Sequence, residues 1–477
     1  MEKQQKFAKY YHLTASYKPK LTFKRNFSLW FQITKGVFKK YIARVLLAVF
    51  LLVLVGLVIK FLVPKLPVFE NNLVIGVVGE YTQDNLPQAL TQLYSSGLTK
   101  IQSDGQIAPS LANWKTADGK KFTFILRDNI SWHDGKEIKT SDLEFVNLPA
   151  EVNVIDEKNI EFILSDAFSP YPASLAKPAF RKNSKVGTGP YKISKLTKNG
   201  ETLRQIALTP VKNNLPQILI NFFPNSHLAV QAFKAGQIGL LFNLPKLNSL
   251  ENWKGAQILQ TFDSTKLVAI FYNTKDELLK NDKVRKALDL SIKREVFKTS
   301  VSTSLPPNSW VKAENDIEFD LQKAEKLLKE TNIQDSKITV LTPSTFKPVI
   351  LEIAANWEKL GIRVEIVEID KIPQDFQAAI FGLEIPADPD QYIFWHSTQS
   401  QKLTRIEDPK LDKLLEDGRK ALELTERRKI YQEFSKELQS LTPASFLFFQ
   451  DKYIVINKNS EEQLVKIKQY FPEFPQN

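Results

Sequence analysis

The longest apolar run in the chain lies near its beginning. Fifteen uncharged residues, Val45–Ile59, stand between Arg44 and Lys60, and Phe61-Leu-Val63 continues the run. Because basic side chains at the ends of such a run can extend along it toward water, its usable length approaches the roughly 20 residues that a bilayer-spanning helix needs. We therefore predict one transmembrane helix at residues 41–63.

A cleaved signal peptide is the alternative interpretation of this run. Such a peptide has an apolar core of about 7–15 residues that ends at a site of small residues. Here the preceding arm is unusually long, and Val63-Pro-Lys-Leu-Pro-Val68 offers no such site. These features favour an uncleaved anchor, and Pro64 and Pro67 predict a spacer at residues 64–71.

Strand patterns follow the spacer. Asn72–Val78 is a continuous apolar run of strand length, and Lys121–Arg127 alternates apolar and polar positions after a turn at Asp118-Gly119. Two further alternating stretches flank the polar turn Asp156–Asn159, one around Val152 and one from Ile160. We expect hairpins of a mixed sheet in this first lobe.

From about residue 280 the pattern changes to helices that alternate with short strands. Asp282 and Asp320 each precede apolar positions at helical spacing, so each is expected to cap a helix. Further elements predict an α/β lobe distinct from the first: the strand Lys337–Leu341, a helix through Trp357 closed by Gly361, the strand Ile362–Val367, a helical pair over Leu411–Leu438 and a buried strand Ser445–Phe449.

The excess of positive charge lies almost entirely in the first segment of the chain. The net charge is +12, yet residues 1–44 hold eleven Lys and Arg against the single acid Glu2, leaving 54 basic and 52 acidic residues in the rest. Lys and Arg resist translocation, which predicts a cytoplasmic basic arm at residues 1–40, a single-pass helix in the cell membrane and an extracytoplasmic bulk. The arm either contacts anionic membrane lipid or serves only as a topology signal, and nucleic-acid binding loses its support.

Residue types that carry familiar chemistry are scarce. The chain has no cysteine, which excludes thiol nucleophiles and also the acceptor for a lipid anchor. The four histidines, His12, His133, His227 and His396, are far apart, and no phosphate loop or nucleophile elbow is present. We therefore predict no catalytic residue, no metal site and no cofactor.

A series of short motifs resembles a known family. In order they are Ala108-Pro-Ser-Leu-Ala-Asn-Trp114, Trp132-His-Asp-Gly-Lys136, Gly187-Thr-Gly-Pro-Tyr-Lys192, Phe271-Tyr-Asn-Thr274, Val284-Arg-Lys-Ala-Leu288 with Lys293-Arg294, Leu360-Gly-Ile-Arg-Val-Glu365 and Asp388-Pro-Asp390. Their ordered succession over nearly all of residues 72–455 resembles the family 5 extracellular solute-binding proteins of peptide and nickel ABC importers, the oligopeptide- and dipeptide-binding kind.

This resemblance implies an α/β, two-lobed fold of the periplasmic-binding-protein type (type II). The expected lobes are residues 72–268 with 451–477, and residues 269–450. The implied function is to capture an oligopeptide or a related small solute between the lobes and to deliver it to the permease subunits of an ABC importer. Such a site needs no reactive group, so an enzyme is not expected.

The chain departs from the family pattern at two places outside the anchor. The helical subdomain that usually follows Trp132-His-Asp-Gly135 is largely deleted, because Ser141–Val146 passes almost at once to Asn147–Glu151. Where peptide binders carry a Gly-Trp pair and an acid that binds the amino terminus of the ligand, this chain has Gly382-Leu-Glu-Ile-Pro-Ala-Asp388, with Leu383 in the place of Trp. Glu384 or Asp388 could take the role of that acid.

Ligand contacts are expected where the first strand leaves its sheet and across the cleft from it. An acid among aromatic side chains could receive an ammonium group, and an aromatic wall could cover apolar groups. Trp132, His133, Gly135 and Tyr191 are expected to determine the fold instead. The candidate ligand-binding residues are Glu80, Tyr81, Thr82, Gly382, Leu383, Glu384, Asp388 and Trp395.

Two other functions remain open at this point. The deleted subdomain and the lost Trp would also suit a degenerate binding fold that acts as a surface sensor or scaffold without transport. A hydrolase acting on the captured ligand is the third hypothesis, since Asp and Glu are abundant.

Overall fold

The computed structural model divides into two compact units, residues 1–71 and 72–477, and each is described by itself. The structure describes residues 23–61, 72–145, 148–212, 214–314, 317–331, 336–371, 373–399 and 403–470.

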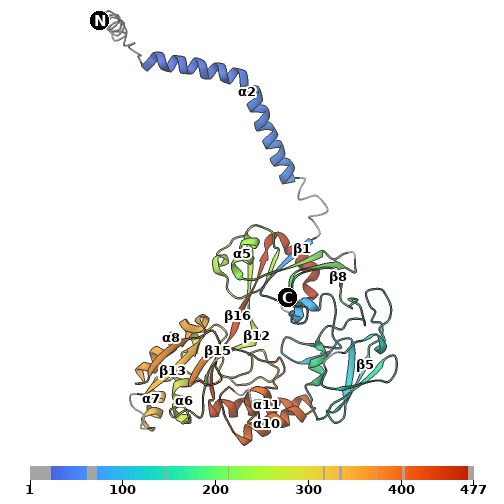
Figure 1. The fold of residues 1–477 in the computed structure, drawn as a ribbon, viewed down its shortest axis with the longest axis vertical. Helices are drawn as coiled ribbons and strands as arrows, with labels where there is room; N and C mark the ends of the chain where they lie inside the picture. The colour runs from blue at the N-terminus through green and yellow to red at the C-terminus, as the bar shows by residue number, and fades with distance from the viewer. Residues whose placement is uncertain are drawn as a thin grey trace, which may run out of the picture. The chain divides into compact units, whose positions relative to one another are not determined.

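The first unit contains one long helix, α2 (Phe23–Phe61), drawn in blue in Figure 1. Its large apolar side chains from Leu46 to Leu57 are exposed. Within the described residues, no helix has both the length and the apolar character that crossing a membrane requires. The predicted membrane-spanning helix at residues 41–63 is thus not confirmed. Its last two residues, the spacer at 64–71 and the first 22 residues of the arm lie outside the described residues.

The second unit is built on one mixed sheet of ten strands, in the order β14-β13-β15-β12-β16-β11-β1-β10-β9-β8. Strand β1 is parallel to both of its neighbours and β13 to both of its own, whereas the remaining neighbours are antiparallel. The strands are β1 (Asn72–Val78), β8 (Tyr191–Asn199), β9 (Thr202–Pro210), β10 (Gln217–Phe223), β11 (Leu240–Leu244), β12 (Ala256–Tyr272), β13 (Lys337–Thr342), β14 (Arg363–Glu368), β15 (Ala378–Glu384) and β16 (Ala444–Asn457).

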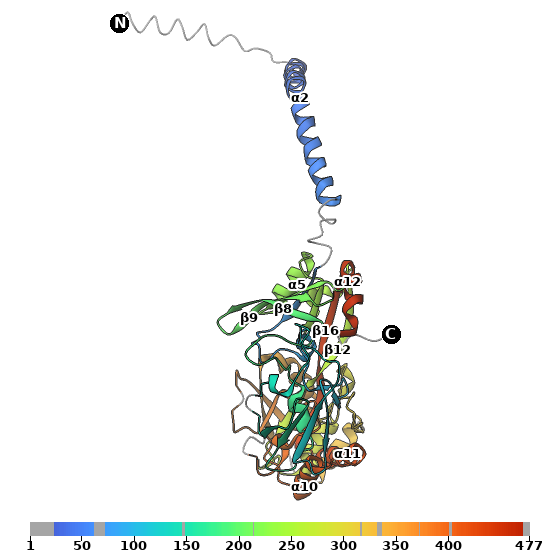
Figure 2. The same ribbon diagram turned by 90° about the vertical axis from the view of Figure 1, so that its right-hand side faces the viewer.

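Two long antiparallel strands, β12 and β16, run through both lobes (Figure 2). Their pairing shifts register between Phe262 and Leu267, which marks an irregularity midway along both strands. The predicted strand Ser445–Phe449 is therefore only the first part of β16. The predicted lobe boundaries at residues 268 and 450 fall inside these strands rather than in a linker.

In the first lobe, hydrophobic cores lie on both faces of its half of the sheet, and helices cover them. One core gathers Ile75, Ile220 and Tyr191, and a second core on the other face holds Phe233 and Leu241. The covering helices are α4 (Gln88–Thr91), α5 (Ser226–Lys234) and α12 (Glu461–Ile467).

In the second lobe, too, cores lie on both faces of its half of the sheet and helices cover them. Asp320 accepts a hydrogen bond from the Lys323 N–H and caps a helix as predicted, whereas the other cap is Asn281 rather than Asp282, because the Asn281 side chain accepts from the Lys283 N–H. Phe271 and Trp395 lie in the core on one face. The helices are α6 (Asp282–Leu290), α7 (Leu321–Lys329), α8 (Lys347–Lys359), α9 (Tyr392–Trp395), α10 (Pro409–Lys420) and α11 (Leu424–Leu441).

The predicted hairpins form a sheet of their own. Strands β4 (Ala112–Thr116), β5 (Lys121–Leu126), β7 (Asn159–Ile163) and β6 (Glu151–Val154) make a four-stranded, wholly antiparallel sheet. The expectation that they join a mixed sheet is wrong, because Phe122, Phe124 and Phe162 close a separate core with Trp132 and Tyr171. A small hairpin of β2 (Thr99–Ile101) and β3 (Ile107–Pro109) precedes this sheet.

The expected loss of a helical subdomain agrees with the course of the chain here. The short 3-10 helix η2 (Thr140–Asp142) is followed by β6 with no further helix in residues 143–145 and 148–150, the described part of that connection.

Candidate ligand-binding site

A cavity of about 1150 Å³ lies in the first lobe beside the crossing strand β12. Its walls come from residues within 92–110, from the turn at 188–190, from 258–261 of β12, from Ile454 of β16 and from Gln469 with Tyr470. Small-molecule sites measure about 300–1,000 Å³, so the space suffices for a solute larger than a single amino acid.

The lining is polar but almost uncharged. Gln92, Gln102 and Gln469 bring amides to it, and Ser96 and Ser103 bring hydroxyl groups. Among the described residues that line the cavity, Lys100 is the one with a charged side chain.

Residues of the second lobe contact the rim of this cavity. The Lys298 ammonium donates to the Gln260 side-chain oxygen over 3.1 Å, and the Asn308 amide donates to the Ser103 carbonyl. Trp310 strengthens this contact, since its backbone N–H donates to the carbonyl oxygen of Asp104, one residue beyond Ser103, over 2.9 Å. The cavity therefore lies where the two lobes meet.

The first group of predicted ligand residues lies at the end of β1, outside the lining of this cavity. Glu80 is exposed, while Tyr81 is half-buried with its ring 5.6 Å from that of Phe222. Burial raises the pKa of Tyr81, with Asp263 adding to the rise and a hydrogen bond from Asn243 opposing it. Thr82 turns back on the chain, since its N–H donates to the Asn85 side-chain oxygen over 2.6 Å.

The second group lies on β15, where Gly382 and Glu384 are exposed and Leu383 is partly buried against a second-lobe core. Glu384 pairs in register with Lys266 of β12.

The irregular part of β12 links the two groups. Thr265 donates from its N–H and its hydroxyl to the Asp263 carboxylate, and its carbonyl accepts from the Ile385 N–H next to Glu384. The charge of Asp263 also contributes to the raised pKa of Tyr81 in the first group. The role of both groups of predicted residues in ligand binding stays a prediction.

Asp388 and Trp395 have partners within the protein. The Asp388 carboxylate is buried and accepts hydrogen bonds of 2.8 and 2.6 Å from the Arg427 guanidinium. Asp388 and Arg427 line a smaller cavity of about 230 Å³ together with Trp310. Trp395 is 1 % exposed, and its indole N–H donates to Gln391 over 2.9 Å. Any contact of these two side chains with a ligand would need a different arrangement.

The two most recognisable motifs contact each other. The backbone N–H of His133 donates to the Gly187 carbonyl, the Gly187 N–H donates to the His133 Nδ1, and Nε2 lies 3.0 Å from the Gly189 carbonyl. Since Nδ1 accepts, the proton resides on Nε2, which donates to Gly189. Burial lowers the pKa of His133, and the charge of Lys192 lowers it further. Trp132 and Tyr191 are buried, as expected of residues that determine the fold.

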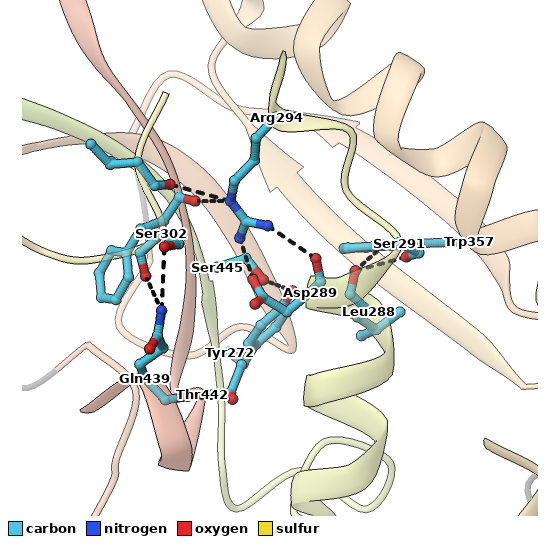
Figure 3. A network of polar contacts seen from close by, with 12 residues as sticks. Tyr272, Leu288, Asp289, Ser291, Arg294, Ser302, Trp357, Gln439, Thr442 and Ser445 are labelled. Atoms are coloured by element: carbon cyan, nitrogen blue, oxygen red, sulfur yellow. Dashed lines mark hydrogen bonds and ion pairs between the residues drawn. The ribbon is translucent and has the colours of Figure 1, made fainter. Parts of the chain in front are cut away.

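Arg294, from another of these motifs, organises a buried polar network in the second lobe (Figure 3). Its guanidinium donates to the carbonyls of Val301 and Phe446 and forms an ion pair with Asp289. In the same network Tyr272 and Ser445 share a hydrogen bond of 2.7 Å. These contacts join α6 to β16 and the loop that reaches the cavity rim, so the motif positions the second lobe rather than a ligand.

No cluster of three or more His, Asp or Glu side chains suited to a metal ion occurs in the part of the chain that the structure describes. Among its described residues, the cavity lining contains no histidine, aspartate or glutamate that could act as a base.

A family model decides the identity of the second unit. The model of bacterial extracellular solute-binding proteins, family 5 Middle, matches residues 106–403. These include the motifs, the segment 298–310 at the cavity rim and most of the second lobe. The chain belongs to this family. It is a solute-binding protein of the kind that serves peptide and nickel ABC importers.

Individual relatives are distant but match over most of their length. The oligopeptide-binding protein AppA of Bacillus subtilis is 23 % identical, over 82 % of this chain and 88 % of the relative. The probable D,D-dipeptide-binding periplasmic protein DdpA of Escherichia coli is 23 % identical, over 79 % of this chain and 87 % of the relative.

Solved structures show that the fold is shared. NikZ from Campylobacter jejuni, crystallised with Ni(L-His), superposes with a TM-score of 0.63 at 22 % identity, covering 81 % of this chain and 94 % of that one. The structure of AppA from Bacillus subtilis in complex with a nonapeptide gives a TM-score of 0.58 at 20 % identity with the same coverage. The two-lobed α/β fold expected from the motifs is confirmed.

Sequence reasoning missed the cavity lining. Gln92, Gln102 and Ser103 look like ordinary solvated loop residues, and nothing in their spacing separates them from other loops. The one available sign was the polar stretch Thr99–Ser103 immediately before the recognisable Ala108–Trp114 motif.

Proposed function

We propose that this protein is the receptor of an ABC importer and that it binds a peptide or a related small solute in the first-lobe cavity. The observation that carries the proposal is the cavity itself, which lies beside the register shift of β12 and has second-lobe residues at its rim. A two-lobed protein can close on a ligand when a few residues between the lobes absorb the change in backbone angles. Residues 263–266 of β12 supply such a segment.

Delivery to permease subunits is the second part of the proposal. Its support is the family, whose members include relatives named for oligopeptide, dipeptide and nickel binding. Cells that lack this protein should lose uptake of the solute that it binds, and supplying the chain again should restore uptake.

Attachment to a membrane through residues 41–63, with an extracytoplasmic bulk, is the third part. Large apolar side chains along α2, including Leu47, Phe50 and Leu52, are between 58 % and 71 % exposed, and apolar surface of this kind is costly in water. Deleting Val45–Ile59 should release the protein from the membrane fraction. If the full chain already partitions into the aqueous fraction, this part of the proposal fails.

Binding is tested with the full chain purified in mild detergent. A solute that binds the native state alone raises the midpoint of thermal unfolding as its concentration exceeds the dissociation constant. Screening short peptides, sugars, sugar acids and nickel–histidine complexes should identify at least one class that does so. Complete absence of a shift would contradict a receptor and would favour the surface sensor or scaffold.

A further inference from the structure

The charge of the cavity lining restricts which solutes it can hold. Lys100 lies in β2 and its side chain is exposed. Within the described residues, its ammonium group forms no hydrogen bond and no ion pair. A lysine at a cavity wall without a partner provides three hydrogen-bond donors and one positive charge for a ligand.

No carboxylate or imidazole lines the cavity among its described residues. The nearest acid along the chain, Asp104, has both carboxylate oxygens engaged by Gln106, at 2.9 Å from its N–H and 3.0 Å from its side-chain amide. The described lining thus lacks an anionic side chain that could compensate the charge of a ligand ammonium, and an uncompensated charge is costly to bury. The described lining also has no imidazole, which is the side chain that best suits a nickel ion.

The remaining polar groups are neutral and can both donate and accept. Gln92, Gln102, Gln469, Ser96 and Thr261 have side chains without a hydrogen-bond partner within the described residues, and all of them line the cavity. Amides and hydroxyls of this kind suit a ligand body rich in peptide or hydroxyl groups.

We infer that the cavity selects a polar solute through a carboxylate placed at Lys100, and that it does not recognise a free amine or a metal centre. The inference rests on the proposed function, because it names the ligand class of the same cavity. It differs from the amine-clamping scheme that the motif comparison suggested, since the charged contact here is a cation of the protein.

The test uses the full chain in detergent and random four-residue peptides in three forms: free, N-acetylated and C-amidated. Sugar acids, matched neutral sugars and the nickel–histidine complex complete the panel, and binding is measured by calorimetry. The expected result is that N-acetylated peptides or sugar acids bind, whereas the amidated or neutral counterparts bind at least about tenfold more weakly.

Two variants with the same change of charge locate the effect. Lys100→Gln should lower the affinity for the carboxylate form about tenfold or more and leave the affinity for the amide form unchanged. Lys195→Gln removes an exposed lysine on β8, outside the cavity lining, and should change neither affinity. Circular dichroism of both variants verifies that the fold is retained.

The outcomes separate the two proposals. Binding of amidated peptides but not acetylated ones, of neutral sugars alone, or of the nickel complex would overturn the carboxylate inference while the receptor function stands. An unchanged preference in Lys100→Gln would overturn it as well. Absence of binding by every probe would remove the proposed function, and the inference with it.

Discussion

Arg427 of α11 holds the carboxylate of Asp388 with two parallel hydrogen bonds, and both side chains are more than nine-tenths buried. Burial alone would lower the pKa of Arg427, but the charge and hydrogen bonds of Asp388 outweigh burial and raise it. The Arg427 Nε–H also donates to the Gly418 carbonyl at the end of α10 over 3.0 Å. The pair therefore ties the segment after β15 to both helices.

Replacing Arg427 by methionine should destabilise the protein by about 3–5 kcal/mol, because it leaves Asp388 buried without its positively charged partner. Adding Asp388→Asn should recover part of that loss. Urea unfolding of the two single variants and the double variant measures the coupling. Arg405→Met is the matched control, since its pair with Asp375 is largely exposed and should contribute less than about 1 kcal/mol. Equal losses at the two arginines would contradict this assignment.

The Arg294 network predicts that lysine cannot replace arginine there. A lysine keeps the charge near Asp289 but cannot reach the carbonyls of Val301 and Phe446 with a planar fork of donors. Arg294→Lys should therefore lower the free energy of unfolding by about 2–4 kcal/mol. Arg127→Lys is the control, because Arg127 is exposed and makes one 3.1 Å bond to Ser110, so the change should stay within about 0.5 kcal/mol.

Gly187 leaves no room for a side chain. A β-carbon there would lie 2.1 Å from the Tyr94 carbonyl oxygen, and backbone atoms cannot move aside as the end of a flexible side chain can. Gly187→Ala should cost about 2–3 kcal/mol in denaturant unfolding. Gly255→Ala, whose nearest neighbour would be the Trp253 side chain at 3.3 Å, should change stability by less than about 1 kcal/mol. Similar values for the two would show that this turn adapts.

His133 gives the stability a defined pH dependence. Its pKa is lowered from 6.5 in the folded protein, mainly by burial; the hydrogen bond to the Gly189 carbonyl opposes this, Lys192 adds to the lowering and Asp134 opposes it. As pH falls through the unfolded value, the unfolded chain takes up a proton that folded His133 resists, so stability is full above about 6.5 and declines below it.

His133→Asn should flatten this decline in urea unfolding between about pH 8 and pH 5. His227→Asn removes an exposed histidine and should leave the slope as it is in the unaltered protein. A decline of the same steepness in His133→Asn would assign the pH dependence to other groups.

Local elements could be predicted from sequence wherever a cap and a periodic face occur together. Asp320 and the apolar spacing after it define α7. Gly361 follows the end of α8 in the left-handed conformation, with φ +83°, as expected of a glycine that closes a helix. The length of β12 could not be predicted, because its middle residues from Gln260 to Lys266 are mostly polar and do not alternate. Pairing with β16 at Gln260–Phe262 and with β15 from Lys266 onward keeps them within one strand, and both partners come much later in the chain.

The candidate site was less predictable than the fold. A carboxylate such as Asp388 looks equally suited to a ligand or to an ion pair, and nothing in the sequence indicates that Arg427 reaches it from α11. The cavity at Lys100 is lined both by β2 and by residues 258–261 of β12, which are far apart in the chain. Uncharged glutamines acquire significance only through that placement.

The continuity of β12 and β16 has a consequence for how the protein can be divided. Separating the lobes at the two predicted boundaries would sever β12 and β16 and expose the backbone groups of both strands, which invites association with other chains. Neither lobe is therefore an independent module for expression or for exchange with a relative. Chimaeras that alter ligand choice should instead transplant the loops and the β2–β3 hairpin, leaving the central pair of strands from a single parent.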